Sequence, residues 1–357
     1  MKLLIVVLLM LFVMLSGCAQ AQPEAPVAGV PAPAPVETEP AENNTPEDIP
    51  VSEPETRRLN IVCAIFPQYD WVREILGEKA YRFDLTLLMD NLVDLHNYQP
   101  TFSDIVTIGA SDLFIHVGGH SDGWVYDVLR QATNPDIVVL NLLDVVGDEV
   151  KMELLLEGMQ HDCDDDCDDP FHDHGDGHDH EDEHVWLSLR LAKAICAAIA
   201  DVLSEMDPDN ADVFQSNLEA YIEKLAALDL EYQAAVDAAN VTTLVFADRF
   251  PFRYLMDDYG LSYYAAFAGC SAETEASFST IVFLATKVEE LMLNNVMVTE
   301  TADHAIARTV IDSTPRGTQQ ILVLNAMQAV TRRDIDNGMT FLSIMENNLE
   351  VLREALS

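Results

Sequence analysis

The chain has 357 residues, is 49% apolar and carries a formal net charge of −42. A chain of this length and apolar content can bury a large core and fits one to three globular domains. So strong a negative charge repels nucleic-acid phosphates and anionic lipids, and we therefore expect no nucleic-acid partner. The same charge attracts cations, although most of it can serve solubility alone.

The N-terminus has the pattern of an export signal. Lys2 precedes an apolar run, Leu3 to Leu15. This run has the length of a signal-peptide core and is shorter than the roughly 20 apolar residues of a membrane-spanning helix. Small residues then come directly before Cys18. The arrangement resembles a bacterial lipobox, in which residues 1–17 are removed and Cys18 is lipidated. An ordinary signal peptide followed by a chance cysteine is the alternative.

The segment after Cys18 predicts a tether. Residues 18–57 are rich in Pro, Ala and Glu and contain almost no large apolar side chains. Such a segment cannot bury a core, so we expect it to be extended and disordered. The predicted product is an extracytoplasmic lipoprotein, anchored by lipid to the cell membrane, with a folded body that begins near Arg58.

The body has two halves in which short apolar runs alternate with helical patterns. In the first half the predicted strands are residues 60–66, 84–89, 113–117 and 137–141, and in the second half 243–247, 296–299 and 321–324. Strands that alternate with helices favour parallel sheets covered on both faces. We therefore predict an α/β protein with two doubly wound (βα) lobes, an N-terminal lobe over residues 58–206 and a C-terminal lobe over residues 241–357.

Residues 207–240 predict one long helix between the lobes. Apolar side chains recur at helical spacing from Phe214 to Tyr232, and Pro208 lies where the first turn of a helix tolerates proline. At 1.5 Å per residue the helix would measure roughly 40 Å and could join both lobes as a rigid linker. The cleft between the lobes is the expected ligand site, because ligands of open α/β sheets bind beyond the carboxyl ends of the strands.

A low-complexity tract lies before this helix. Residues 161–184 hold six histidines, twelve acidic residues and two cysteines, without lysine or arginine. Ordering the loop 161–183 would cost about 1–2 kcal/mol per residue in backbone entropy, so we expect weak binding at several points. Two interpretations stay open: an auxiliary loop that feeds or senses the metal site, and a solvated loop whose metal binding is incidental. The candidate ligands of this loop are His161, Cys163, Cys167, His172, His174, His178 and His180.

Two histidines differ from the others by their position. His96 lies in a polar loop after the run 84–89 and before a helix that Thr101 would open. His184 is the last histidine of the tract and begins an amphipathic helical pattern, beside Trp186. Each has a plain alternative, since His96 could be an exposed loop residue and His184 merely the end of the tract.

The sequence around these histidines resembles the zinc- and manganese-binding receptors of ABC importers. DLHNYQPTFSDI (94–105) is similar to their D-P-H-x-Y-x-P-x-x-x-D motif, and EHVWLSLRLAK (183–193) to their D-P-H-x-W-L-x-P-x-x-A-K motif. FRYLMDDYGL (252–261) and the last strand and helix add to the resemblance, which covers residues 58–357. It implies two lobes joined by one long rigid helix, a metal ion in the interlobe cleft, and His96 and His184 as first-lobe ligands.

The second-lobe ligands depart from the family's pattern. Such receptors usually add a His or Glu and then an Asp, but these positions fall here on Arg249 and Asn325. Arginine cannot bind a cation, and it would instead pair with a cleft carboxylate or close against the other lobe. We name Asp248 and Glu300, each after a predicted strand, as the substitutes, with Cys270 as a further candidate.

Imidazole ligands favour zinc over calcium or magnesium, and the tract favours zinc over the harder manganese. We therefore expect a monomeric zinc-binding receptor that delivers Zn²⁺ to an ABC permease and its ATPase subunit. A manganese (Mn²⁺) receptor and a surface metal buffer or adhesin are the alternatives within the family. A zinc hydrolase would need an open coordination position and a general base. Because we predict no closely spaced ligand pair on one helix, we expect no enzyme.

Overall fold

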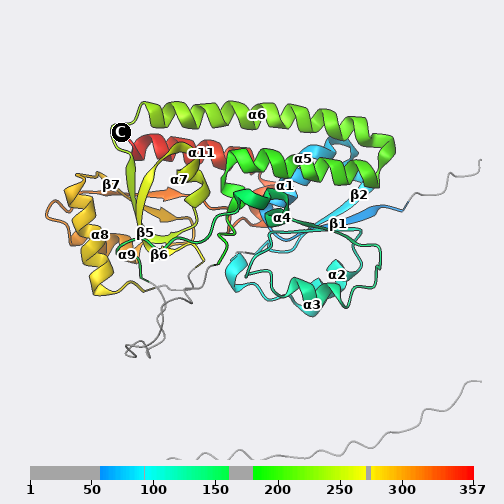
Figure 1. The fold of residues 1–357 in the computed structure, drawn as a ribbon, viewed down its shortest axis with the longest axis horizontal. Coiled ribbons are helices and arrows are strands. Elements are labelled where there is room, and N and C mark those ends of the chain that lie inside the picture. The colour runs from blue at the N-terminus through cyan, green and yellow to red at the C-terminus, as the bar shows by residue number, and fades with distance from the viewer. Residues whose placement is uncertain (1–56, 92, 161–179, 271–274) are drawn as a thin grey trace, which may run out of the picture. The chain divides into compact units, whose positions relative to one another are not determined.

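The computed structural model describes residues 57–91, 93–160, 180–270 and 275–357. They form two α/β lobes, each built on a four-stranded parallel sheet (Figure 1). The predicted signal peptide, the lipidation site Cys18, the tether up to residue 56 and the tract from 161 to 179 lie outside these ranges. Within them, none of the helices combines the length and the apolar character that crossing a membrane requires.

The first lobe is built on the sheet β2-β1-β3-β4. The expected strand 60–66 ends three residues early, because Phe66 and Pro67 begin helix α1, whose first turn accepts proline. β3 is buried along its whole length, as a parallel strand between two layers of helices requires. The strands are β1 (Leu59–Cys63), β2 (Phe83–Leu87), β3 (Leu113–His116) and β4 (Val138–Asn141), and the helices are α1 (Phe66–Leu76), α2 (Phe102–Gly109), α3 (Val125–Leu129), α4 (Leu142–Val146) and α5 (Leu189–Met206).

The linker is helix α6 (Ala211–Asp237), which follows a 3-10 turn at Pro208–Asn210. Its 27 residues agree with the helix that the apolar spacing predicts. Figure 1 shows α6 running along both lobes, with the C-terminal helix α11 (Phe341–Ala355) beside it. The hydroxyl of the buried Tyr232 donates to Met345 O at 2.6 Å and so joins these two helices.

The second lobe repeats the strand order of the first, as β6-β5-β7-β8. Its strand β6 (Ser262–Ala268) is absent from the sequence prediction, although Gly260 in the left-handed region ends the preceding helix and so marks where the strand can begin. The other strands are β5 (Thr243–Phe250), β7 (Asn295–Thr299) and β8 (Gln320–Leu324), and the helices are α7 (Arg253–Tyr259), α8 (Phe278–Glu290), α9 (Ala305–Asp312) and α10 (Arg332–Asp336).

The shared strand order makes two connections equivalent. β2 and β6 are the corresponding edge strands of the two sheets. The chain that leaves β2 enters α2, which Thr101 caps, and the chain that leaves β6 enters α8, which Ser277 caps. The two β–α connections therefore hold equivalent places at the carboxyl ends of their sheets, where ligands of such folds bind.

One apolar core joins the first lobe, α6, α11 and part of the second lobe. Trp71 on α1 packs edge-on against Phe341 on α11, with ring centroids 5.0 Å apart. Beside this contact the buried Asp70 accepts a hydrogen bond from Phe341 N at 2.8 Å. A separate core fills the space between the second sheet and helices α8 and α9. The last helix thus belongs to the packing of both lobes.

Asp70 should make stability depend on pH. Burial raises the pKa of Asp70 to about 6, although the Phe341 N–H favours the charged form. The unfolded chain loses this proton near pH ~3.9, so the native state binds the extra proton between these two pKa values. As the pH rises from about 4 to 7, the free energy of unfolding of the wild type should fall by about 2–3 kcal/mol relative to Asp70→Asn. Urea unfolding at both ends of this range measures the difference.

The exposed Asp127 provides the matched control, because its side chain is 77% exposed. Asp127→Asn should track the wild type at every pH. A gap between wild type and Asp70→Asn that does not change with pH would contradict the expectation.

Candidate metal site

His96 is positioned by the connection between β2 and α2. It lies in a 3-10 turn, Leu95–Asn97, that Asp94 caps by accepting from His96 N at 3.0 Å. Thr101 then opens α2 through a capping box with Asp104. The His96 side chain is only 5% exposed. Two successive caps therefore fix the backbone on which this imidazole is carried.

His184 is fully buried and precedes the 3-10 turn Val185–Leu187. The helix α5 begins later, with Ser188 as its cap, so His184 does not lie in the helix that the sequence predicts there. The indole of Trp186 donates to Ala326 O of the second lobe at 2.9 Å. This contact packs the His184 segment against the opposite lobe.

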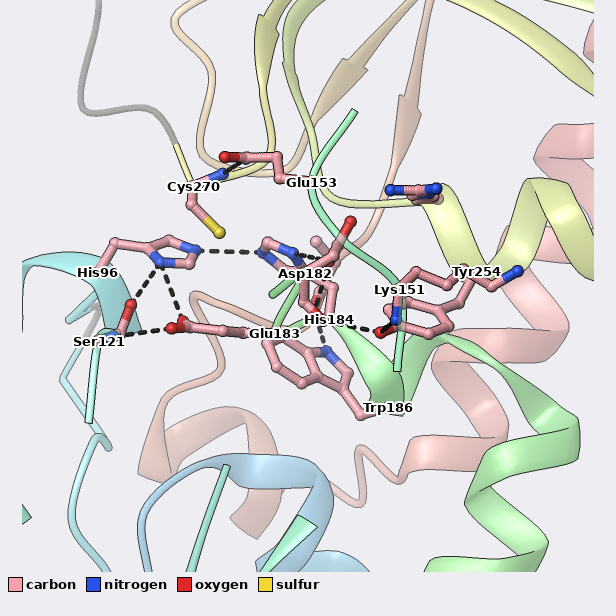
Figure 2. A network of polar contacts seen from close by, with 12 residues as sticks. His96, Ser121, Lys151, Glu153, Asp182, Glu183, His184, Trp186, Tyr254 and Cys270 are labelled. Atoms are coloured by element: carbon pink, nitrogen blue, oxygen red, sulfur yellow. Dashed lines mark hydrogen bonds and ion pairs between the residues drawn. The ribbon is translucent and has the colours of Figure 1, made fainter. Parts of the chain in front are cut away.

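The two imidazoles face each other through the same ring atom. His96 Nε2 and His184 Nε2 are 3.1 Å apart. The other ring nitrogen of His184 lies 2.9 Å from Asp182 Oδ1, and that of His96 lies 2.9 Å from Ser121 Oγ and 3.5 Å from Glu183 Oε2 (Figure 2). The Asp182 carboxylate can only accept, so His184 Nδ1 carries the hydrogen and His184 Nε2 offers a lone pair; His96 takes the same tautomer when the Ser121 hydroxyl accepts from its Nδ1.

The spacing and the charge of the pair suit a cation. Two ligands of a tetrahedral zinc ion with bonds of about 2.0–2.1 Å lie roughly 3.3 Å apart. Burial, and then the neighbouring His184, lower the pKa of His96 to about 3. His96 is therefore neutral near pH 7, as a metal-ligating imidazole must be.

The carboxylates behind the imidazoles correct our prediction for the loop 161–183. Asp182 and Glu183, which the sequence places in that solvated loop, are 3% and 1% exposed. Glu183 Oε1 accepts from Ser121 N at 2.7 Å, and burial raises the pKa of Glu183. Gly119, at φ +77°, makes room for it, since a Cβ there would lie 2.5 Å from Glu183 Oε1. Such outer partners orient a ligand imidazole and raise its basicity.

Cys270 follows β6, on the connection equivalent to the one that carries His96. Its sulfur and the nitrogens of His96 and His184 lie within 4.8 Å of one another. Across the residues that the structure describes, this is the one group of three or more His, Cys, Asp or Glu side chains that could hold an ion. Burial, and then Glu153, raise the pKa of Cys270 well above its usual range, so the free thiol is protonated.

The carboxylates that we named for the second lobe do not join this group. Asp248 lies inside β5 at an irregularity of its pairing, and its Oδ2 accepts from both Thr299 N and Thr299 Oγ1. Glu300 accepts from Ala326 N and Gln328 N at 2.8 Å each. Both side chains therefore brace backbone at the ends of strands, and neither is directed at the imidazoles by these contacts.

Asn325, at the other departure from the family's pattern, also serves the backbone. Its side-chain oxygen accepts from Met327 N at 2.7 Å. The side chain that reaches the imidazoles from this loop is Gln328, which the sequence analysis missed. Its amide nitrogen lies 3.2 Å from His184 Nε2 and 3.4 Å from His96 Nε2. An amide NH₂ has two hydrogens, one for each lone pair.

Arg249 closes against the first lobe, as we expected for an arginine at this position. Its guanidinium lies 2.6 Å from Asp94 Oδ2, and both side chains are 15% exposed. Asp94 is also the residue that caps the His96 turn. The positive charge of Arg249 is close enough to contribute to the lowered pKa of His96. One ion pair therefore links the second lobe to the loop of the first ligand.

Two hydrolase-like motifs in this region also escaped the sequence analysis. Residues 180–184 read HEDEH, but they form no helix, so the two histidines are not a helical ligand pair. The ring of His180 instead lies against His120, with centroids 4.9 Å apart. Residues 119–123 read GHSDG, a G-x-S-x-G match in which Ser121 lacks the strained backbone of a nucleophile elbow.

Comparison with known protein families decides where this site belongs. The model of the family ZnuA, zinc-uptake complex component A periplasmic, matches residues 61–355. The chain belongs to the ZnuA family. It is 31% identical over 299 residues to the zinc-binding lipoprotein AdcA of Streptococcus pneumoniae, an alignment that covers 83% of this chain and 56% of the relative. The chain thus spans little more than half the length of its AdcA relatives.

Other ZnuA-family relatives agree in length and fold. The high-affinity zinc uptake system protein ZnuA of Bacillus subtilis is 28% identical over 300 residues, with 84% of this chain and 88% of the relative covered. The crystal structure of the Zn(II)-bound ZnuA-like domain of Streptococcus pneumoniae AdcA superposes with a TM-score of 0.64 at 27% identity, over 84% of this chain and 99% of the other. These matches confirm the two-lobed α/β fold.

Neutralising Asp182 should weaken metal binding in this ZnuA-family chain. In Asp182→Asn the side-chain oxygen can still accept from His184, but the negative charge beside the ligand imidazole is lost. We expect the affinity for Zn²⁺ to fall about tenfold, as for other outer partners of metal ligands. Competition with a chromophoric chelator measures the affinity. Asp257→Asn, on the surface of α7, is the control, and equal affinities of the two variants would contradict the role of Asp182.

Removing the Arg249 charge should act on stability and on binding in opposite directions. Arg249→Gln leaves the largely buried Asp94 carboxylate unpaired, so the free energy of unfolding should fall by about 1–3 kcal/mol. The affinity for Zn²⁺ should rise roughly fivefold, because about 1 kcal/mol of repulsion by a nearby cation is removed, while the hydrogen bond from Trp186 to Ala326 O still holds the lobes together at the site. Urea unfolding and chelator competition measure the two effects. Arg316→Gln, paired with Glu289 elsewhere on the lobe, should change neither by as much.

Proposed function

We propose that this chain is an extracytoplasmic zinc-binding receptor that captures the ion and delivers it to an ABC permease and its ATPase. The observation that carries the proposal is the buried pair of imidazoles, whose Nε2 atoms face each other at 3.1 Å. Each Nδ1 is occupied by a hydrogen-bond partner, so both lone pairs point to one place. Membership of the ZnuA family supports the same cargo, since relatives are named for zinc binding and zinc uptake.

Zinc is the cargo that the ligand chemistry favours. Neutral imidazoles are borderline ligands, and the cysteine sulfur nearby is a soft one, whereas manganese prefers carboxylates and water. Among the residues described, no Asp or Glu belongs to the ligand group. Manganese remains the alternative cargo, and a surface metal buffer or adhesin the alternative role, because both would use the same pair of imidazoles.

The proposed mechanism is binding and release without chemical change of the cargo. His96 and His184 come from the first lobe, and second-lobe groups close over them. The contacts that hold the lobes together at the site include the pair Arg249–Asp94 and the hydrogen bond from Trp186 to Ala326 O. Both must break, or move apart together, before the ion can leave. We infer that binding to the permease provides the energy that opens the lobes, and that the ATPase drives the permease.

The address of the receptor follows from the sequence and from its relatives. We propose that Cys18 is lipidated and that residues 18–57 tether a monomeric body to the outer face of the cell membrane. The name zinc-binding lipoprotein in the family supports this anchor. The histidines and cysteines of the tract from 161 to 179 are proposed as an auxiliary metal loop. Its sequence joins the site directly, because Asp182 and His184 follow within five residues of position 179.

Removing either imidazole should abolish tight zinc binding. In His96→Ala or His184→Ala one of the two convergent lone pairs is missing, so the affinity of the single tight site should fall by about 100-fold or more, beyond the effect of an outer partner. Elemental analysis and chelator competition measure binding, and zinc uptake by cells at limiting zinc measures delivery. His304→Ala, at the start of α9, is the control.

Two results would contradict the proposal. Unchanged tight binding in both imidazole variants would show that the ion binds elsewhere. Intact binding by the wild type, but uptake that is the same with and without the permease, would favour the surface buffer.

A further inference from the structure

We propose that Cys270 is the second lobe's ligand, so that the ion is held by two imidazoles and a thiolate. This inference rests on the proposed function of the same site and names the residue that replaces the family's missing second-lobe ligands. On binding, the Cys270 sulfur donates an electron pair to the cation, and the thiol proton leaves to solvent. The bound zinc would then have the ligand set His96, His184 and Cys270, with a fourth position for one oxygen donor.

The position of the sulfur is the first argument. Cys270 Sγ and the two imidazole nitrogens lie within 4.8 Å of one another. Zn–S bonds of about 2.3 Å and Zn–N bonds of about 2.0–2.1 Å place these ligand atoms roughly 3.6 Å apart in a tetrahedron. Figure 2 shows the Cys270 sulfur pointing toward the space between His96 and His184. A small movement of the loop would therefore complete the coordination.

The backbone before Cys270 lies unusually close to the His184 imidazole. Gly269 lies so close to the site that a Cβ would come within 2.8 Å of Phe250 O and 3.0 Å of His184 Cε1. Only a glycine lets the chain pass against the face of that imidazole. Cys270 N then donates to Glu153 Oε1 at 2.9 Å, which fixes the residue from the first-lobe side. The cysteine is therefore held next to His184 by contacts on both sides of its Cα.

The occupation of the other second-lobe candidates is the second argument. Asp248 and Glu300 are engaged with backbone N–H groups, and Arg249 is paired with Asp94. Among the described residues of the second lobe, the other side chain that reaches the imidazoles is the Gln328 amide, which carries no charge. A thiolate gives the ion one negative charge, which the neutral imidazoles and the amide cannot supply.

The fold equivalence of the two lobes is the third argument. His96 lies on the connection β2–α2 and Cys270 on the connection β6–α8, which correspond in the two sheets. Each lobe would thus contribute a ligand from the same place in its own topology. Closing the lobes brings the two connections together, so a ligand on each makes the closed state depend on the ion.

A thiolate ligand predicts metal selectivity. Soft thiolates bind zinc, cobalt and cadmium far better than they bind manganese. Loss of the sulfur should therefore lower the affinity for Zn²⁺ by about tenfold or more, at least as much as loss of an outer partner. The affinity for Mn²⁺ should change by less than about twofold, so the zinc-to-manganese preference should fall by nearly the same factor as the zinc affinity.

The experiment compares Cys270→Ser and Cys270→Ala in the full chain. Both are made in a Cys163→Ser/Cys167→Ser background, so that the thiols of the tract cannot contribute to the measured spectrum or affinity. Co²⁺ is the spectroscopic probe, because a cobalt–thiolate bond gives a near-ultraviolet charge-transfer absorption that imidazole ligands do not give. Zn²⁺ and Mn²⁺ affinities are then measured by competition. Cys196→Ala, a buried cysteine outside the site, is the matched control, and urea unfolding confirms that each variant is folded.

The expected result is a charge-transfer band in the background protein and in Cys196→Ala that both Cys270 variants lose, together with the fall in zinc affinity. A band that persists in folded Cys270→Ser overturns the proposal, as does a zinc affinity that stays the same. His96→Ala in the same background separates the two levels of inference. If His96→Ala weakens binding and Cys270→Ser does not, only the cysteine ligand is wrong. If neither weakens binding, the proposed function of the site fails as well.

Discussion

The site depends on two buried imidazole nitrogens that face each other with their lone pairs. Such a pair is unfavourable without a shared partner, since both atoms are acceptors in a place that water reaches poorly. Asp182 accepts from His184 Nδ1, and the Ser121 hydroxyl, whose backbone N–H donates to Glu183, lies against His96 Nδ1. The Gln328 amide can donate to both nitrogens when no ion is bound. A divalent cation interacts with both lone pairs more strongly than the amide does. This difference favours the bound ion over the site without an ion.

The charge of the second lobe follows from this constraint. Arg249 places a permanent positive charge near His96, which helps to lower the pKa of that imidazole and opposes the binding of a second cation beside it. Its pairing with Asp94 offsets much of that repulsion and ties the arginine to the loop of the first ligand. The same ion pair fastens the two lobes at the site. In the proposed receptor, ligand position and lobe closure are thus parts of one contact, so release of the ion cannot be separated from movement of the lobes.

Local patterns in the sequence predicted the elements whose signals are local. The long linker helix follows from apolar spacing over its 27 residues, and the two histidines follow from motifs with flanking caps. The sequence did not predict β6, because its aromatic run has neither a strict alternation of polar and apolar residues nor a turn dipeptide. Without this strand, nothing in the sequence placed Cys270 at the end of a strand. Asp248 was misplaced because β5 continues through an irregularity that composition does not reveal.

The boundary of the tract shows a different limit. Its last acidic residues have the same letters as the loop before them, yet Asp182 and Glu183 are buried against His184 and His96. Only the three-dimensional partner distinguishes a solvated carboxylate from one that orients a ligand. The same holds for HEDEH. Its sequence matches a catalytic zinc-binding motif, but these residues form no helix, so the two histidines are not a pair of ligands on one helix face. Chemistry at this site is decided by which ring nitrogen each carboxylate reaches, and that follows from the packing of the two lobes rather than from residue order.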